Sequence, residues 1–457
     1  MDLFRKKDIA ASFDNESHLA KCLNVFDLTF LGVGAIIGAG IFILTGIVAA
    51  TYAGPAIIFS YIVAGFACAF AALSYAELAS SIGGCGSAYG YAYAGFGELI
   101  AWIVGWDLLL EYSISVSAVS VGWSGYANDF LMAMKIHVPA IFLHGPLDGG
   151  ILNLSAFSII AVLTALLILG VKSSTRFNNT MVIIKLSVIL LFIVIASTEV
   201  KIQNWASFMP FGWTGVMKGA SVIFFAYIGF DAVSTAAEEA INPQRDLPRG
   251  IIGSLVICTL LYIVVSGLLT AIAYYPTLNV SSPISHSLLV LGYKTAAGLI
   301  GVGAVAGLTT VMLVLFYGLT RVFLAMSRDG LLPRYFSKTN EYTKTPIRII
   351  LLCGILMSSL SAMVPISDLA ELVNIGTLFA FIIVCSGVLH LHRTQPEMRR
   401  PFKTPGLPVV PILGIICCSY LIIQLPWVTM LRFMIWMIIG LIIYFVFSRR
   451  HSLLETS

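Results

Sequence analysis

Long, almost uncharged apolar runs recur along this 457-residue chain, and they constrain its fold more than any other feature. A helix that crosses the hydrocarbon core of a bilayer needs roughly 20 consecutive, mostly apolar residues. Apolar residues make up 59% of the sequence and charged residues 11%, whereas a soluble domain is about 25% charged. A soluble enzyme cannot hide this much apolar surface. We therefore expect an all-α, polytopic membrane protein.

Twelve of these runs have the length of a membrane span. They cover residues 26–51, 55–82, 98–126, 152–171, 180–198, 213–240, 249–274, 296–326, 347–364, 369–391, 408–425 and 427–447. The polar segments between them are too short for a separate soluble domain. The first run lacks a convincing signal-peptidase site, so we expect it to remain as a membrane helix.

The Lys and Arg residues predict the orientation of these helices. With a cytoplasmic N-terminus, nineteen of the 26 basic residues fall on the cytoplasmic side and five on the opposite side. Cytoplasmic segments of membrane proteins are enriched in Lys and Arg. We therefore predict an integral plasma (inner) membrane protein with both termini in the cytoplasm, which requires an even number of spans.

Two of the twelve spans differ from the rest. The first carries four glycines within nine residues, at Gly32, Gly34, Gly38 and Gly40. Glycine in a helix interior costs about 1 kcal/mol relative to alanine, so the middle of this span is weak. The sixth contains Gly229 and Asp231, and a carboxylate at membrane depth is costly. We predict a break in both helices.

The two unusual spans stand five apart in the chain order, so they run in opposite directions. This predicts an inverted repeat, with residues 26–198 as the first repeat and 213–391 as the second. Residues 408–447 then form two additional spans, between tails at 1–25 and 448–457. Interrupted helices at matching positions of two halves mark the substrate site of many transporters. For the first span alone, close helix packing through Gly34 and Gly38 is the alternative.

A broken helix exposes backbone groups that can bind a ligand. Free N–H groups and the positive end of a helix dipole attract an anion, and free carbonyl oxygens attract a cation. A free amino acid carries both charges a few Å apart. The two breaks therefore predict an amino acid as substrate.

Six segments distributed over nearly the whole chain carry a more specific indication. They are GVGAIIGAGIF (32–42), SYAELA (74–79), GWDLLLEY (105–112), the stretch 224–239, NPQRDLP (242–248) and AMSRDGLLP (325–333). In these segments the chain resembles the amino acid–polyamine–organocation superfamily, in particular the cationic amino acid transporter branch and its bacterial relatives. The resemblance implies a leucine-transporter fold with broken helices 1 and 6, and alternating-access transport of amino acids.

The resemblance also implies which backbone groups hold the substrate. The carboxylate would bind the amides of Ile36, Ala39 and Gly40, and the ammonium would bind the carbonyls of Phe225, Ala226 and Ile228. Relatives often have Ser or Thr at position 39. Ala39 lacks that hydroxyl, so one hydrogen bond to the carboxylate is missing here.

Two charged residues inside the spans are candidates for coupling or gating. Lys185 lies in the fifth span, and either it extends to the cytoplasmic interface or it faces the broken first span. The resemblance links this position to proton coupling, at the place where sodium-coupled members of the fold hold a sodium ion. Asp231 either caps the second half of the broken sixth span or acts as a gate, and the two roles are compatible.

Other side chains bear on the size and charge of the substrate. Asp107 and Glu111 share one face of the third span, where they are either a structural pair or a pocket wall that favours a cationic substrate. Leu315 of the eighth span would shorten the pocket and disfavour a long cationic side chain. We expect Glu77 to pair with Arg321 or Arg328 near the cytoplasmic side.

These observations predict a secondary active transporter, with proton-coupled symport of small neutral L-amino acids. A cationic amino acid transporter or exchanger and a sensor without transport are the alternatives. The sequence contains no HExxH, GxSxG or Walker A motif, so we do not expect an enzyme. The expected partners are a free amino acid, the proton and the lipid bilayer, without nucleic acid, cofactor or metal ion. The sequence leaves open whether a small accessory membrane protein also binds.

Overall fold

The computed structural model describes residues 5–6, 21–82, 86–133, 136, 138–143, 145–146, 149–280, 282–364, 366–425 and 427–453. Most of the predicted N-terminal tail and the last four residues lie outside the described residues. Within them, regular structure is helical apart from one isolated β-bridge between Leu23 and Ala240. The predicted all-α class is confirmed.

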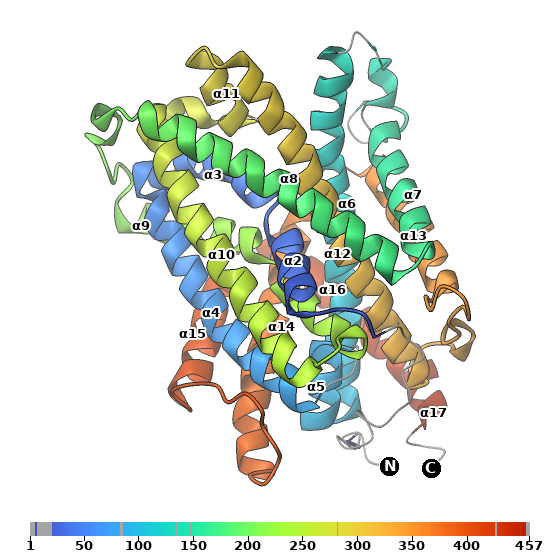
Figure 1. Ribbon diagram of the computed structural model, residues 1–457. Coiled ribbons are helices and arrows are strands. Elements are labelled where there is room, and N and C mark those ends of the chain that lie inside the picture. Colours follow the sequence, from blue (N-terminus) through green and yellow to red (C-terminus); the bar gives the residue numbers. More distant parts are fainter. Residues whose placement is uncertain are drawn as a thin grey trace.

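The long helices follow the predicted spans closely (Figure 1). They are α4 (Ile57–Ile82), α6 (Glu98–Ala133), α7 (Leu154–Ile168), α8 (Val171–Thr198), α10 (Pro243–Ile272), α12 (Lys294–Arg328), α13 (Ile347–Met363), α14 (Ile366–Thr394), α15 (Val409–Ile423) and α16 (Trp427–Ile443). Helix α8 begins nine residues before the predicted span, because its polar first turns continue the helix beyond the apolar run.

Short helices lie in the connections and at the C-terminal end. They are η3 (Gly54–Ala56), α5 (Ala88–Gly95), η4 (Ala140–Phe142), η6 (Ile202–Trp205), η9 (Tyr275–Leu278), α11 (Pro283–Val290), η10 (Arg334–Phe336), η11 (Tyr444–Ser448) and α17 (Arg449–His451). The sequence analysis did not predict α5 or α11, since neither has the length of a span.

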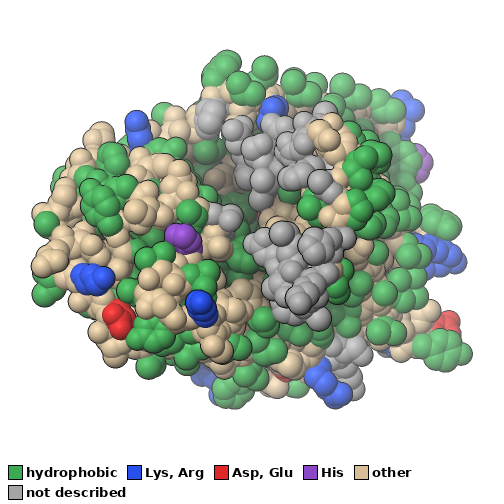
Figure 2. Space-filling view, turned by 90° about the horizontal axis from the view of Figure 1, so that it is seen from above, with side chains coloured by type: hydrophobic (Ala, Val, Ile, Leu, Met, Phe, Trp, Pro, Cys, Tyr) green, Lys and Arg blue, Asp and Glu red, His purple; other side chains and the backbone are tan. Residues whose placement is uncertain are grey.

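Eight helical stretches among the described residues are long and apolar enough to cross a membrane. One of them, Val25–Ile82, contains the first two predicted spans, and α7, α13 and α15 are shorter apolar helices. On the described part of the face opposite the two termini, hydrophobic and other uncharged side chains predominate, and the charged side chains lie mostly at its periphery (Figure 2). These features are typical of a polytopic membrane protein.

The predicted breaks are present in both unusual spans. In the first, α2 (Val25–Ile36) is followed by an extended Ile37, and the chain continues as η1 (Gly40–Leu44), α3 (Thr45–Val48) and η2 (Ala49–Ala53). In the second, α9 (Gly212–Ile223) and η7 (Phe224–Tyr227) are separated from η8 (Phe230–Glu239) by an extended Ile228 and by Gly229. Gly229 has a φ of 117°, which favours glycine over residues with a side chain.

The broken helices lie inside a ring of longer helices. Helix α2 packs against α8, α10, α12 and η8, while α4 packs against α9 and η7. Helices α15 and α16 lie outside this arrangement and pack against α14, with α15 also against α4 and α16 against α6. Trp106 of α6 stacks on Trp436 of α16 with ring centroids 4.5 Å apart, which holds α16 to the bundle.

Candidate substrate site

The two broken helices contact each other directly at their breaks. A Cβ atom added to Gly40 would lie 2.2 Å from the Cβ atom of Ala226. One added to Gly229 would lie 2.7 Å from the Cβ atom of Ala35. Only glycine lets the two backbones approach this closely. Helix packing therefore explains these glycines on its own, and a bulky substitution there would not by itself test substrate binding.

A small cavity lies where the breaks face α6 and α12. Its lining residues are Ala35, Ile36, Gly38, Ala39, Gly40, Ser115, Val119, Phe225, Ile228, Val311 and Leu315. Six of the eight predicted substrate-binding residues are among them, whereas Ala226 and Glu111 are not. The cavity volume is about 20 Å³, close to what one water molecule needs. In this conformation the protein's own side chains fill most of the site.

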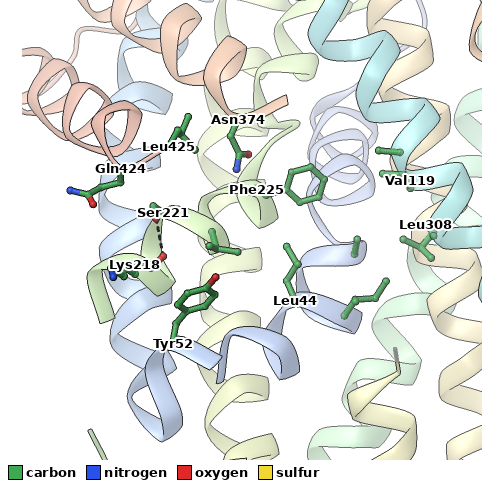
Figure 3. A pocket seen from close by; sticks show the side chains of 15 residues that line it. Leu44, Tyr52, Val119, Lys218, Ser221, Phe225, Leu308, Asn374, Gln424 and Leu425 are labelled. Atoms are coloured by element: carbon green, nitrogen blue, oxygen red, sulfur yellow. Dashed lines mark hydrogen bonds between the residues drawn. The ribbon is translucent and has the colours of Figure 1, made fainter. Parts of the chain in front are cut away.

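A larger cavity of about 560 Å³, here called the vestibule, adjoins the small one (Figure 3). The two share Ala39, Val119 and Phe225 in their linings. The end of the vestibule away from the small cavity is lined by Tyr52, which follows the first span, and by Lys218, which lies near the start of the sixth. A ligand entering there would meet Phe225 before it reached the breaks.

The backbone groups at the breaks are unevenly satisfied. The amides of Gly38 and Ala39 donate no hydrogen bond to another residue that the structure describes. The carbonyl of Ala226 is instead an acceptor, because the Tyr262 hydroxyl of α10 lies 2.8 Å from it and 2.7 Å from the carbonyl of Ile36. Free N–H groups are thus available to an anion. Sequence reasoning missed Tyr262, since one tyrosine in an apolar span does not reveal which backbone it meets.

Lys185 is fully buried and bound to the first break. Its Nζ atom lies 2.9 Å from the carbonyl oxygens of Val33 and Ile37 and 3.0 Å from that of Gly34. The Thr310 hydroxyl of α12 is the fourth partner, at 2.9 Å. The alternative that Lys185 extends to the membrane interface is therefore wrong. The side chain joins α8 and α12 to the unwound end of α2.

Asp231 lies in the first turn of η8, at the positive end of that helix. It is 1% exposed and accepts a short hydrogen bond from the Tyr112 hydroxyl of α6. Its other carboxylate oxygen has no hydrogen-bond partner among the described residues. Asp231 therefore combines a favourable position at the helix start with a link between the second break and α6.

Asp107 and Glu111 are buried on α6, at 0% and 1% exposure. All four of their carboxylate oxygens lack a hydrogen-bond partner among the described residues. Of the two alternatives for these residues, the structural pair with Ser, Tyr or Lys partners therefore has no hydrogen bond in its support among the described residues. Glu111 lies one turn from Ser115, which lines the small cavity, so it stands beside the cavity without reaching it.

Comparison with known proteins assigns the family. The sequence pattern described as amino acid permease matches residues 23–448, nearly the whole chain. The chain belongs to the amino acid permease family. The resemblance to the amino acid–polyamine–organocation superfamily is confirmed. The permease is therefore an integral membrane protein of a transporter family and not an enzyme.

Individual relatives of the permease differ in their substrates. A branched-chain amino acid permease of Bacillus subtilis (strain 168) is 51% identical, and the alignment covers 99% of both chains. A methylthioribose transporter of the same organism is 48% identical, again over 99% of both chains. The vacuolar cationic amino acid transporter 4 of Arabidopsis thaliana is 37% identical over 84% of this chain and 65% of its own.

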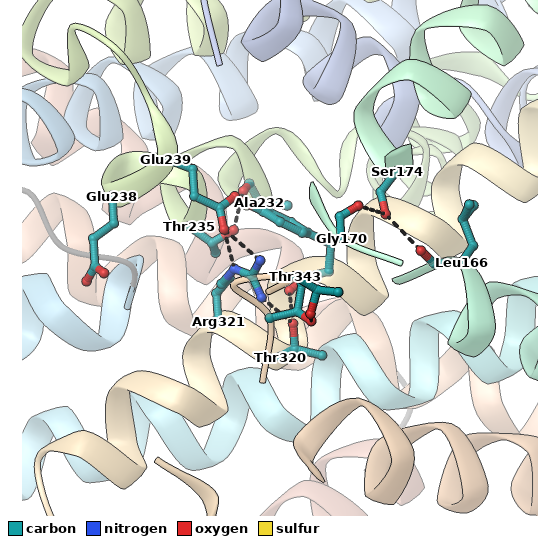
Figure 4. A network of polar contacts seen from close by, with 12 residues as sticks. Leu166, Gly170, Ser174, Ala232, Thr235, Glu238, Glu239, Thr320, Arg321 and Thr343 are labelled. Carbon is teal, nitrogen blue, oxygen red and sulfur yellow. Dashed lines mark hydrogen bonds and ion pairs between the residues drawn. The ribbon is translucent and has the colours of Figure 1, made fainter. Parts of the chain in front are cut away.

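A buried polar network joins the end of η8 to α12 (Figure 4). Arg321 of α12 pairs with Glu239 at the end of η8, with an N–O distance of 2.6 Å, and both side chains are at most 2% exposed. The Tyr317 hydroxyl also donates to Glu239. The predicted pairing of Glu77 with Arg321 or Arg328 is wrong, because Glu77 pairs with His392 in the last turn of α14 and with Arg400 in the loop that follows.

Proposed function

We propose that the permease is a proton-coupled transporter of neutral aliphatic L-amino acids that works by alternating access. The observation that carries this proposal is the meeting of two helix breaks at one apolar cavity, with free amides at the first break. Those amides suit a carboxylate, and the carbonyls of the second break suit an ammonium group. The vestibule then corresponds to an outward-open path, with the opposite side closed by the Glu239–Arg321 pair.

The proposed architecture is the leucine-transporter fold with twelve membrane-spanning helices. In it, α2 to α8 form one repeat and α9 to α14 the inverted second repeat, while α15 and α16 are additional. Both termini would face the cytoplasm. The breaks at equivalent places of α2–η1 and η7–η8 support this assignment.

The side chains around the cavity favour a neutral aliphatic substrate. Val119, Ile228, Val311 and Leu315 are apolar and line it together. Burying an unpaired ammonium or guanidinium among them would be costly. The branched-chain amino acid permease of Bacillus subtilis, with 51% identity over nearly the whole chain, points the same way.

The runner-up is a cationic amino acid. The observation in its favour is the unpartnered pair of carboxylates, Asp107 and Glu111, one to two turns along α6 from Ser115. A cationic side chain that reached Glu111 would supply the missing partner. Leu315 and Val311 stand in the cavity itself, and for this reason we rank the neutral substrate first.

The contacts of Lys185 support a proton as the coupling ion. An ammonium group has three hydrogens, and four oxygens lie within 3.0 Å of this one. After losing a proton, the amine could donate two hydrogen bonds and accept one from Thr310. At least one carbonyl of the first break would then lose its donor, so a change of protonation would loosen α2 from α8.

We expect competition between substrates to decide the proposal. Uptake of labelled leucine or alanine into proteoliposomes should be blocked by excess unlabelled leucine, valine or alanine and far less by arginine. Methylthioribose belongs in the same assay because of the second Bacillus relative. Strong competition by arginine alone would establish the cationic alternative, and competition by methylthioribose alone would reject an amino acid substrate. Binding of leucine without uptake would identify a sensor.

We expect Leu315→Ser to widen the range of substrates toward arginine. The shorter side chain removes an apolar wall whose overlap with a long substrate costs about 1–3 kcal/mol. Arginine competition measured side by side in the parent and the variant gives the effect. Leu299→Ser, an exposed leucine on the same helix α12, is the matched control and should leave selectivity unchanged. Equal arginine competition in the parent and Leu315→Ser would show that Leu315 does not limit the pocket.

A further inference from the structure

A groove at the start of α10 has the features of a lipid-headgroup site. It has a volume of about 680 Å³ and is lined by Gln244, Arg245, Pro248, Arg249, Ile252, Gly253, Pro401 and Phe402. It lies outside the substrate path, sharing no lining residue with the small cavity or the vestibule. One wall is the first three turns of α10, and the other is the loop between α14 and α15.

The two arginines of the groove are exposed cations on one helix face. Arg245 and Arg249 are four residues apart, so they lie one turn above each other. Neither makes an ion pair or a side-chain hydrogen bond with any residue that the structure describes. Asp246 of the same turn is 7% exposed and therefore turned inward. The positive charge of the groove is thus available to an external anion.

The wall opposite the arginines is held rigidly. The Arg400 guanidinium bonds the carbonyls of Leu391 and Gln395 and lies 3.3 Å from Glu77. The backbone amide of Thr404 donates to the other oxygen of Glu77 at 2.7 Å. Because buried contacts fix the chain on both sides of Pro401 and Phe402, the groove is formed before any ligand arrives.

An apolar stripe continues from the arginines along α10. Ile252, Val256, Leu260 and Val264 follow Arg249 at steps of three or four residues, so they share its face. The last three are between 42% and 59% exposed, as expected for side chains that meet lipid. The groove therefore offers positive charge at one level and apolar surface directly beside it, which is the pattern of a phospholipid.

We propose that this groove binds the headgroup of an anionic phospholipid, with Arg245 and Arg249 on the phosphate and an acyl chain along Val256 and Leu260. Arginine suits this role because its planar guanidinium can give a phosphate two parallel hydrogen bonds. The proposed topology decides only which leaflet supplies the lipid, and it places the groove in the cytoplasmic leaflet. Basic pockets between membrane helices on that side bind such headgroups in general.

Lipid binding to the full-length protein, measured by native mass spectrometry, tests the proposal. Phosphatidylglycerol should be retained in preference to phosphatidylcholine. Each basic residue near the membrane surface contributes roughly 1 kcal/mol to the binding of anionic lipid. The double variant Arg245→Gln/Arg249→Gln should therefore weaken phosphatidylglycerol binding about 30-fold. Arg245→Lys/Arg249→Lys, which keeps the charges, should lose less. Arg334→Gln/Lys344→Gln removes two exposed cations that line neither this groove nor the other cavities described above, and it should change nothing.

Further arms distinguish the source of the anion. Inorganic phosphate at millimolar concentration and a neutral diacylglycerol should not displace phosphatidylglycerol. Phosphate lacks the acyl chains, and diacylglycerol lacks the anionic headgroup. Displacement by phosphate alone would overturn the lipid assignment in favour of a free-anion site. Equal phosphatidylglycerol binding by the parent and the Arg245→Gln/Arg249→Gln variant would overturn the site altogether. Neither result bears on amino acid uptake, so the proposed function is tested separately.

Discussion

Replacing Lys185 by methionine is expected to abolish proton-driven uptake. The substitution keeps much of the volume but removes the group that binds three carbonyls of the first break and Thr310. A hydrogen bond to a charged group contributes about 1.5–3 kcal/mol, and a difference of about 1.4 kcal/mol changes an equilibrium constant tenfold. We therefore expect a loss of at least about tenfold in uptake driven by an inward proton gradient, measured in proteoliposomes.

The Lys185 result needs a control for folding and one for charge. Exchange of labelled for unlabelled substrate across the membrane does not require net proton movement, so an uncoupled but folded variant should retain exchange. Lys201→Met removes an exposed lysine and should leave uptake unchanged. Full uptake by Lys185→Met at every pH, or an absolute need for sodium in the parent, would disprove the proposed coupling.

Replacing Arg321 by methionine is expected to cause the largest loss of stability. The change leaves the carboxylate of Glu239 buried without its cation, and removal of one partner from a buried ion pair typically costs about 3–5 kcal/mol. Thermal unfolding of the purified variant in detergent should show a clear drop in midpoint. Because the pair joins η8 to α12, we also expect easier opening of the side that carries the termini.

The double variant Arg321→Met/Glu239→Gln provides the decisive comparison. It removes both charges, so it should recover much of the stability that the single variant loses. Arg328→Gln breaks an ion pair with Glu238 whose side chains are 27% and 18% exposed. A partly exposed pair of this kind contributes about 0–1 kcal/mol, so this variant should unfold close to the parent. Equal thermal unfolding midpoints for Arg321→Met and Arg328→Gln would show that burial of the ion pair does not determine its contribution to stability.

The sequence predicted the features that depend on local chemistry. The lengths of the apolar runs predicted the long helices. The glycine-rich stretch before Gly40 predicted the first break, and Gly229 predicted the second. For Lys185 the sequence left two alternatives, and the hydrogen bonds of its Nζ atom to the first break decide for the one that faces the first span. The roles of these residues in transport remain predictions, which the substitutions above address.

Features that depend on contacts between distant segments were not predictable from one sequence. Glu77 is an example, because the sequence does not show which of the many basic residues lies next to this carboxylate in the fold. In the structure it binds His392 and Arg400, more than 300 residues away. The position of the Tyr262 hydroxyl between two breaks likewise depends on the packing of α10, which no local pattern encodes.

The short contact between the start of the first span and the end of η8 has a mechanical consequence. The amides of Cys22 and Leu23 both donate to the carbonyl of Glu239, and the amide of Ile241 donates to that of Leu23. Each such bond contributes about 0.5–1.5 kcal/mol net, so separating the two segments would cost a few kcal/mol in every cycle. In the proposed alternating-access cycle, the less costly motion keeps the two segments joined, so that α2 and η8 move together as one rigid body. A disulfide engineered across this contact would then leave transport intact, whereas one between η8 and α12 would stop it.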